Sequence, residues 1–147
     1  MAMQTKQKHI HSLRGFTLLE LLVVLLIIAL LAGYVGPKLF GEVGKAKTKT
    51  AMSQMKSIAG ALDQYRLDNG RYPSTEEGLA ALTKKPASAS NKWAGPYLMK
   101  DAPNDPWDRP YVYKVPGDNG RDYELLSYGL DGRAGGESED ADISYWQ

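Results

Sequence analysis

One continuous apolar stretch near the start of the chain constrains the fold more than any other feature. Residues 16–35 carry a single charged side chain, Glu20. A helix needs about 20 apolar residues to cross the hydrocarbon core of a bilayer. Residues 1–15 precede the stretch with three basic side chains and no acidic one, and basic residues beside a membrane helix stay in the cytoplasm. The pattern predicts a membrane-spanning helix over residues 16–36, followed by an exported head over residues 37–147.

A cleaved secretory signal is the simplest alternative for such a stretch. Signals of that kind have an apolar region of about 7–15 residues followed by a small-x-small cleavage site. The stretch here is longer, and residues 33–37, Gly-Tyr-Val-Gly-Pro, do not offer an Ala-x-Ala match. We therefore expect the apolar segment to stay in the mature protein.

Charge and residue usage exclude several classes of function. The chain has a formal net charge of +1, which falls to −2 when residues 1–15 are left out, so nucleic acid is not an expected partner. The sequence contains no cysteine, and both histidines, His9 and His11, lie in the leader. Without that leader, a cysteine nucleophile, a histidine general base and a zinc site built on His or Cys are all excluded.

The apolar segment continues into a second, amphipathic stretch over residues 45–69. Its apolar side chains recur at helical spacing. They are Ala51, Met52, Met55, Ile58, Ala59, Leu62 and Tyr65. Asn69 and Gly70 are a typical C-terminal stop, whereas Pro37 is expected to kink the helix without ending it. The sequence thus predicts one long helix from Phe16 to about Asn69.

The remainder predicts a small α+β head packed on that helix. Ser74 and Glu77 have the spacing of a capping box and predict a second helix through residues 79–82. Residues 111–115 and 123–128 are rich in β-branched and aromatic side chains, and a segment dense in turn formers separates them, which predicts an antiparallel hairpin. A further short extended piece is expected near residues 97–99.

The junction between leader and apolar stretch resembles the cleavage site of type IV prepilins and type II secretion pseudopilins. Residues 14–20 read Arg-Gly-Phe-Thr-Leu-Leu-Glu. In that family a dedicated inner-membrane peptidase cuts after the glycine and methylates the new N-terminal amine. The resemblance implies cleavage between Gly15 and Phe16, N-methylation of Phe16, and retention of the apolar helix.

Glu20 is the one charge within the apolar helix. A carboxylate in a membrane helix costs several kcal/mol unless it is paired. The resemblance implies that Glu20 pairs with the Phe16 amine of a neighbouring subunit, which would neutralise both charges and fix the register between helices. The plainer alternative is that Glu20 reaches the membrane edge, because it lies only five residues into the stretch.

The head resembles the major pseudopilin of type II secretion systems over most of its length. The matching segments are residues 61–79, 95–98, 105–111, 126–132 and 141–143. Asp108 departs from the family's Asp-Pro-Trp-Gly pattern, which puts the local turn geometry in doubt. The resemblance implies a non-enzymatic subunit of a periplasmic pseudopilus that drives the export of folded proteins. It also implies four partners: other copies of the chain, minor pseudopilins, the prepilin peptidase/methyltransferase and an inner-membrane assembly platform.

An acidic loop over residues 131–142 is the candidate metal site. By composition alone it is a solvated acidic loop, and an EF-hand is excluded because Arg133 stands where an acid is required. The resemblance implies instead one structural calcium ion. Its implied ligands are the backbone carbonyl of Tyr128 and the side chains of Asp131 and Asp142, with Asp140 as a plausible addition and Glu137 and Glu139 left in solvent.

Other acids and the tryptophans receive plainer interpretations. We expect turn caps and surface charges at Asp101, Asp105 and Asp108, and packing roles at Trp93, Trp107 and Trp146.

Two other functions remain open from the sequence. One is a minor pseudopilin or a type IV pilin subunit that serves adhesion or DNA uptake. The other is a periplasmic hydrolase tethered by the helix, which would need a cleft lined by two opposed carboxylates.

Overall fold

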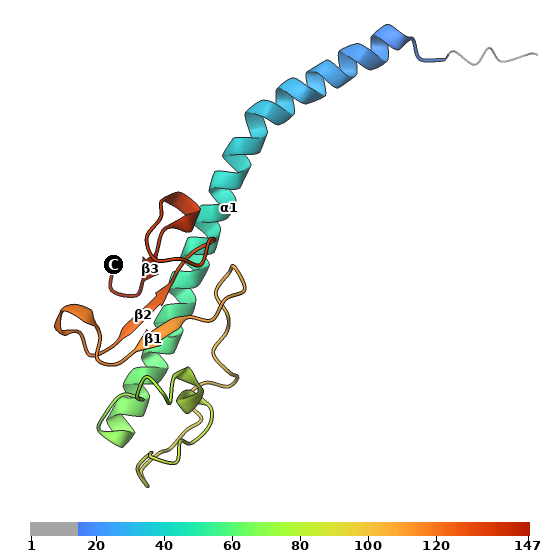
Figure 1. Cartoon of the computed structure of the whole chain (residues 1–147). Helices are drawn as coiled ribbons and strands as arrows, with labels where there is room; N and C mark the ends of the chain where they lie inside the picture. Colours follow the sequence, from blue (N-terminus) through green and yellow to red (C-terminus); the bar gives the residue numbers. More distant parts are fainter. Residues whose placement is uncertain (1–14) are drawn as a thin grey trace, which may run out of the picture. The chain divides into compact units, whose positions relative to one another are not determined.

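The computed structural model describes residues 15–147, and of the predicted leader only Gly15 falls within that range. The described chain forms two compact units that meet between Leu39 and Phe40. Helix α1, Leu18–Asn69, is 52 residues long and contributes to both units (Figure 1). Pro37 lies inside α1 and does not end it, as the sequence predicts.

The described part of the first unit is a segment of apolar helix whose large side chains are not covered by other described residues of that unit. Its large apolar residues, from Phe16 to Leu39, are between 43% and 85% exposed. Among the described residues α1 is the one helix long and apolar enough to cross a membrane. A helix that is apolar on all sides belongs in a bilayer or among other helices.

The second unit places the amphipathic part of α1 at the centre of the head's core. The predicted apolar face is confirmed, since Ala51, Met55, Leu62 and Tyr65 are fully buried and only Met52 is partly exposed. Ile58 and Ala59 belong to the same buried face. The spacing of these side chains at three and four residues puts them on one side of the helix.

A three-stranded antiparallel sheet packs against this part of α1 (Figure 1). The strands are β1, Val112–Lys114; β2, Glu124–Ser127; and β3, Ile143–Ser144, in the order β1-β2-β3. The predicted hairpin is confirmed, with Val112 opposite Leu126. Strand β3 is an addition that the sequence did not predict, and it pairs Ile143 with Ser127. Its two residues are too few to show a periodic pattern.

The predicted second helix is reduced to a single short turn. The capping box itself forms, because Ser74 N–H donates to Glu77 Oε2 at 2.7 Å and Glu77 N–H donates to Ser74 Oγ at 3.2 Å. The helix does not propagate, because Gly78 follows with a φ of 60°, in the left-handed region. What remains is the 3₁₀ helix η1, Leu79–Leu82. Residues 97–99 form a bend where the sequence predicted an extended piece.

Two further 3₁₀ turns complete the fold. They are η2, Asp118–Gly120, in the hairpin connection and η3, Ser138–Asp140, in the acidic loop.

Glu77 also fixes the loop that follows α1. Arg71 donates from Nη1 to Glu77 Oε2 at 2.7 Å and from Nη2 to Oε1 at 2.8 Å, and Ser88 Oγ donates to the same carboxylate. The Glu77 side chain is only 12% exposed. Its hydrogen bonds with Arg71, and then with Ser88 and Ser74, lower the pKa of Glu77 from 4.5 to about 2.

This depressed pKa predicts acid sensitivity of the head. Because the folded state binds a proton at Glu77 less readily than the unfolded state, the stabilisation is full above pH 4.5 and is lost as the pH falls towards 2. Glu77→Gln is expected to lower the free energy of unfolding by about 2 kcal/mol at pH 7 and to flatten the acid limb of the stability curve. Urea unfolding across the pH range checks this.

Glu76→Gln is the matched control, because Glu76 is adjacent and exposed. It should leave the stability at pH 7 nearly unchanged. A Glu77→Gln chain with the same acid limb as the original chain would contradict the assignment.

Candidate functional site

The start of α1 is held by a capping box that the sequence interpretation missed. Thr17 N–H donates to Glu20 Oε2 at 3.2 Å, and Glu20 N–H donates to Thr17 Oγ1 at 3.1 Å. The two residues have the Thr-x-x-Glu spacing of this motif, so the sequence contained the signal. The carboxylate of Glu20 thus lies at the positive end of the helix dipole.

The predicted cleavage site lies just outside the helix. Gly15 and Phe16 precede the first helical residue, Leu18, and Phe16 is 85% exposed. Gly15, Phe16, Thr17 and Glu20 together line a shallow hollow. The peptide bond between Gly15 and Phe16 therefore lies in a non-helical, accessible segment beside the Glu20 carboxylate.

The acidic loop connects the end of β2 to β3, and its own backbone brings its two ends together. Leu130 N–H donates to the carbonyl of Glu139 at 2.8 Å. Gly129 has a φ of 63°, and a Cβ at that position would lie 2.6 Å from the same carbonyl oxygen. This contact joins the segment that follows Tyr128 to the segment that precedes Asp142, so the loop is closed at its base.

The carboxylates at the two ends of the loop have different partners. Asp131 Oδ1 accepts from the N–H of Arg133 at 2.9 Å, and Asp142 Oδ2 accepts from the N–H of Gly135 at 3.0 Å. The other oxygen of Asp142, Oδ1, is buried and finds no donor among residues 15–147. A buried carboxylate oxygen without a partner is costly, and a cation is a suitable partner for it.

The donor set fits calcium, which binds carboxylate and carbonyl oxygens in irregular geometry. Within residues 15–147, no group of three or more His, Cys, Asp and Glu side chains converges on one point. The fit therefore rests on the carboxylates of Asp131 and Asp142 with backbone carbonyls such as that of Tyr128. Asp140 lies at the end of η3 and stays a predicted additional ligand.

One of the two glutamates assigned to solvent is placed differently in the structure. Glu139 is half-buried against Gly44 of α1, where a Cβ would lie 2.6 Å from Glu139 Cγ. Glu137 is exposed, as expected. Gly44 is itself buried, because the acidic loop packs directly on the helix backbone there. No pattern in the sequence indicates this contact, since a glycine in a helix has no side chain to mark a face.

Of the other acids predicted as caps and surface charges, Asp105 requires a correction. It does cap a turn, because Asp105 Oδ1 accepts from the N–H groups of Trp107 at 3.0 Å and Arg109 at 2.9 Å. It is not a surface charge, because it is only 5% exposed and its other oxygen accepts from Ser127 Oγ. Asp101 is exposed as predicted and accepts from Thr83 Oγ1 at 2.8 Å.

Asp108, the departure from the family pattern, lies in a turn with a left-handed backbone. It is exposed and has a φ of 66°, in the left-handed region that favours glycine. Asn104 Nδ2 donates to Asp108 Oδ1 at 3.2 Å and thereby supports the turn. Aspartate tolerates this conformation better than most residues.

The packing roles predicted for the tryptophans agree with the structure. Trp93 and Trp107 pack against the core. Trp146 lies 5.2 Å from Tyr123, measured between ring centroids, and donates from Nε1 to the Tyr123 carbonyl at 3.0 Å.

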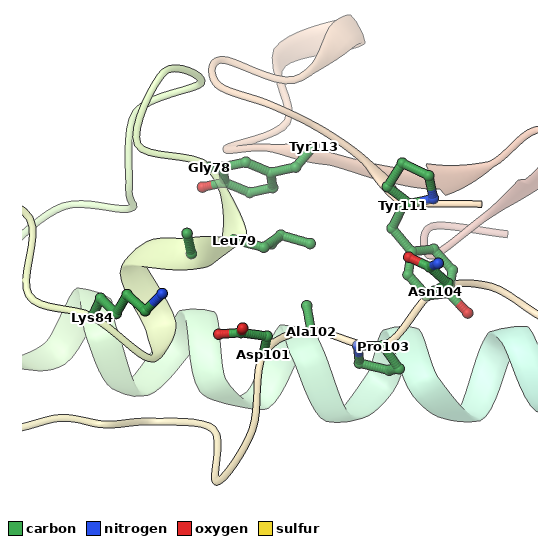
Figure 2. A pocket seen from close by; sticks show the side chains of 11 residues that line it. Gly78, Leu79, Lys84, Asp101, Ala102, Pro103, Asn104, Tyr111 and Tyr113 are labelled. Carbon is green, nitrogen blue, oxygen red and sulfur yellow. The ribbon is translucent and has the colours of Figure 1, made fainter. Parts of the chain in front are cut away.

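A pocket of about 380 Å³ lies between η1 and the segment that leads into β1 (Figure 2). Lys84 and Asp101 lie at one end of it, and Asn104 and Tyr111 at the other. Among the described residues, Asp101 is the single carboxylate in its lining. This pocket therefore does not present the two opposed carboxylates that the hydrolase alternative needs.

An exposed apolar helix behind a Gly-Phe junction, joined to a small head of helix and antiparallel sheet, defines a pilin-like filament subunit. The comparisons with known proteins agree with that class. Residues 11–35 match the family described as the prokaryotic N-terminal methylation motif. Residues 38–146 match the family described as type II secretion system protein G. The chain therefore belongs to the type II secretion system protein G family, the major pseudopilins.

Curated relatives and a solved structure support this assignment. The chain is 45% identical to type II secretion system core protein G of Pseudomonas aeruginosa, over 90% of this chain and 94% of that protein. It is 42% identical to the protein of the same name from Vibrio cholerae, over 95% of each. The crystal structure of the major pseudopilin of enterohaemorrhagic Escherichia coli matches with a TM-score of 0.64 and 37% identity, over 74% of this chain and 89% of that one. The chain is thus a structural subunit of a pseudopilus.

Proposed function

We propose that the chain is made as an inner-membrane precursor with residues 1–15 in the cytoplasm and the head in the periplasm. A prepilin peptidase/methyltransferase cuts after Gly15 and methylates Phe16, and the mature subunits then polymerise through α1. The resulting pseudopilus drives the export of folded proteins. The observation that carries this proposal is the exposed apolar surface of α1 between Phe16 and Leu39.

That apolar surface must be shielded from water both before and after assembly, by a different environment each time. Full burial of one Leu, Ile, Val or Phe side chain is worth about 1.5–3 kcal/mol, so the helix is strongly driven out of water. The bilayer covers it in the precursor, and the same segment of other copies covers it in the filament. The transfer from lipid to filament needs an assembly platform in the inner membrane, and minor pseudopilins are the expected companions of the polymer. None of these steps requires catalysis by this chain.

Glu20 supplies the register of the proposed polymer. Its carboxylate lies beside Phe16, whose amine becomes free after the cut, and it is exposed and therefore open to a second chain. In a medium of low dielectric, a carboxylate and an amine attract each other strongly, and each is costly when left alone. The pairing of Glu20 with the Phe16 amine of the neighbouring subunit satisfies both groups.

We further propose that the acidic loop binds one structural calcium ion. The proposed ligands are the Tyr128 carbonyl, Asp131 and Asp142, with Asp140 as an additional one. The support is the unpartnered, buried Oδ1 of Asp142 in a loop whose ends are already joined. Bound calcium would neutralise part of the loop's negative charge and tie the connection between β2 and β3.

Processing can be tested directly on the protein from membranes of the producing cells. Intact mass and N-terminal fragment analysis should find a chain that starts at Phe16 and carries one additional methyl group. Gly15→Leu should leave the precursor uncut, because a bulky side chain replaces the glycine at the junction. A mature chain that begins after residue 36 would contradict the proposal and support a secretory signal.

The proposed pairing is tested by two substitutions at one position. Glu20→Ala and Glu20→Gln should both insert into the membrane and be cut normally, yet fail to form filaments visible by electron microscopy. Glutamine can still accept the N–H of Thr17, so the second variant removes the charge while it keeps the helix cap.

Glu42→Gln is the matched control, because Glu42 is an exposed acid on α1 that pairs with Lys45 at 3.0 Å. It should assemble normally. Normal filaments from Glu20→Gln would show that the carboxylate acts as a cap alone and would end the pairing hypothesis.

Calcium binding is tested by thermal unfolding of the head, residues 40–147. Removal of calcium with EGTA should lower Tm by about 10 °C relative to a calcium concentration a hundredfold above Kd. Asp131→Ala should abolish this difference, whereas Glu137→Ala, which removes an exposed acid of the same loop, should keep it. An unchanged melting curve in EGTA would refute the calcium site.

A further inference from the structure

The guanidinium of Arg109 holds the backbone at the start of the acidic loop. Its Nη1 donates to the carbonyl of Gly129 at 2.8 Å and to the carbonyl of Leu130 at 2.5 Å. These two carbonyls lie between the proposed calcium ligands Tyr128 and Asp131 in the sequence. Hydrogen bonds from a charged donor are stronger than those between neutral groups, so this contact restricts the segment that must present both ligands.

The turn that carries Arg109 is itself fixed to the base of the loop. Asp105 accepts from the N–H of Arg109, and its own N–H donates to the Arg109 carbonyl at 2.7 Å. The second oxygen of Asp105 accepts from Ser127 Oγ, which in turn accepts from the N–H of Gly129 at 3.2 Å. Asp105 and Ser127 are 5% and 1% exposed, so this chain of hydrogen bonds is buried. Buried, satisfied networks of this kind are rigid.

The loop backbone also fits closely around the arginine side chain. Gly132 has a φ of 69°, and a Cβ at that position would lie 2.6 Å from Arg109 Nε. Only a residue without a side chain allows the loop to pass so near the guanidinium. Arg109 therefore contacts the loop on both sides of Asp131, through Gly129 and Leu130 before it and through Gly132 after it.

We propose that Arg109 is a positioning residue for calcium in this chain: its guanidinium holds the backbone of residues 129–132 in the shape that the ion requires. The inference rests on the calcium site proposed above. The arginine is not a ligand and carries the same sign of charge as the ion. Its electrostatic effect alone opposes calcium binding, so any benefit to affinity must come from the geometry of the loop.

These two effects have opposite signs, which makes the role measurable. Loss of the positive charge should tighten calcium binding, whereas loss of the ordered backbone should weaken it. Groups that orient metal ligands typically change affinity by about 10- to 100-fold when they are removed. We expect Arg109→Met to raise the Kd for calcium at least tenfold, because it keeps the length of the side chain and removes both hydrogen bonds.

The test uses the full-length chain in detergent micelles, stripped with EGTA, exchanged into chelator-free buffer and titrated with calcium chloride by calorimetry. Arg109→Lys should recover part of the affinity, because an ammonium group still donates to carbonyls. Arg133→Met is the matched control, since Arg133 is an exposed arginine of the same loop. Loss of its charge should either leave the Kd for calcium unchanged or lower it.

The outcomes separate the two proposals. If the original chain binds calcium and Arg109→Met binds it equally or more tightly, the positioning role is overturned and the calcium site stands. If the original chain does not bind calcium, the calcium site itself fails, and the role of Arg109 fails with it.

A purely structural role is distinguished by the metal-free Tm. A variant with a lower metal-free Tm but an unchanged Kd would show that Arg109 stabilises the head without positioning calcium. If Arg109→Met does not fold, the Kd of Arg109→Lys decides: a raised Kd at an unchanged metal-free Tm supports the role, and an unchanged Kd overturns it.

Discussion

The constraint on which the rest of the molecule depends is the apolar surface of α1 that no described part of its unit covers. Between Phe16 and Leu39 the large side chains are 43–85% exposed. A helix satisfies its own backbone hydrogen bonds, so it can pass from lipid to a bundle of other helices without exposing polar groups. The same element can therefore serve first as an anchor and then as the contact between subunits, and only its surroundings change.

The head is under a different constraint: its sheet is too small to stabilise it without other contacts. Strand β3 has two residues and β1 has three, and sheets of this size depend on packing against a helix. Loops make up much of the remainder, and buried or half-buried polar side chains hold them. Glu77 ties the loop after α1 through Arg71, and Asp105 ties the turn before β1 to Ser127. In a chain without cysteine, such contacts take the place of covalent links.

The sequence predicted features with strong periodicity or fixed spacing and missed those that depend on tertiary contacts. The residue patterns of the buried face of α1 and of the hairpin extend over enough positions to be recognised. The Ser74–Glu77 box was recognised too, but its helix ended at Gly78, whose left-handed backbone has no periodic signature. Gly44 and Asp105 were missed or misread because their roles come from segments far along the chain, at Glu139 and Ser127. No local sequence pattern indicates a contact partner that lies far along the chain.

In the proposed assembly, one side chain, Glu20, makes both a local contact and a contact between subunits. Among residues 15–147 its carboxylate accepts only the N–H of Thr17, at 3.2 Å and in an exposed position. Such a bond contributes about 0.5–1.5 kcal/mol. An ion pair removed from water is costly to leave half-formed, by about 3–5 kcal/mol. The cap therefore keeps the carboxylate at the helix start in the free subunit, and it is too weak to compete with the proposed pairing to a neighbour's amine.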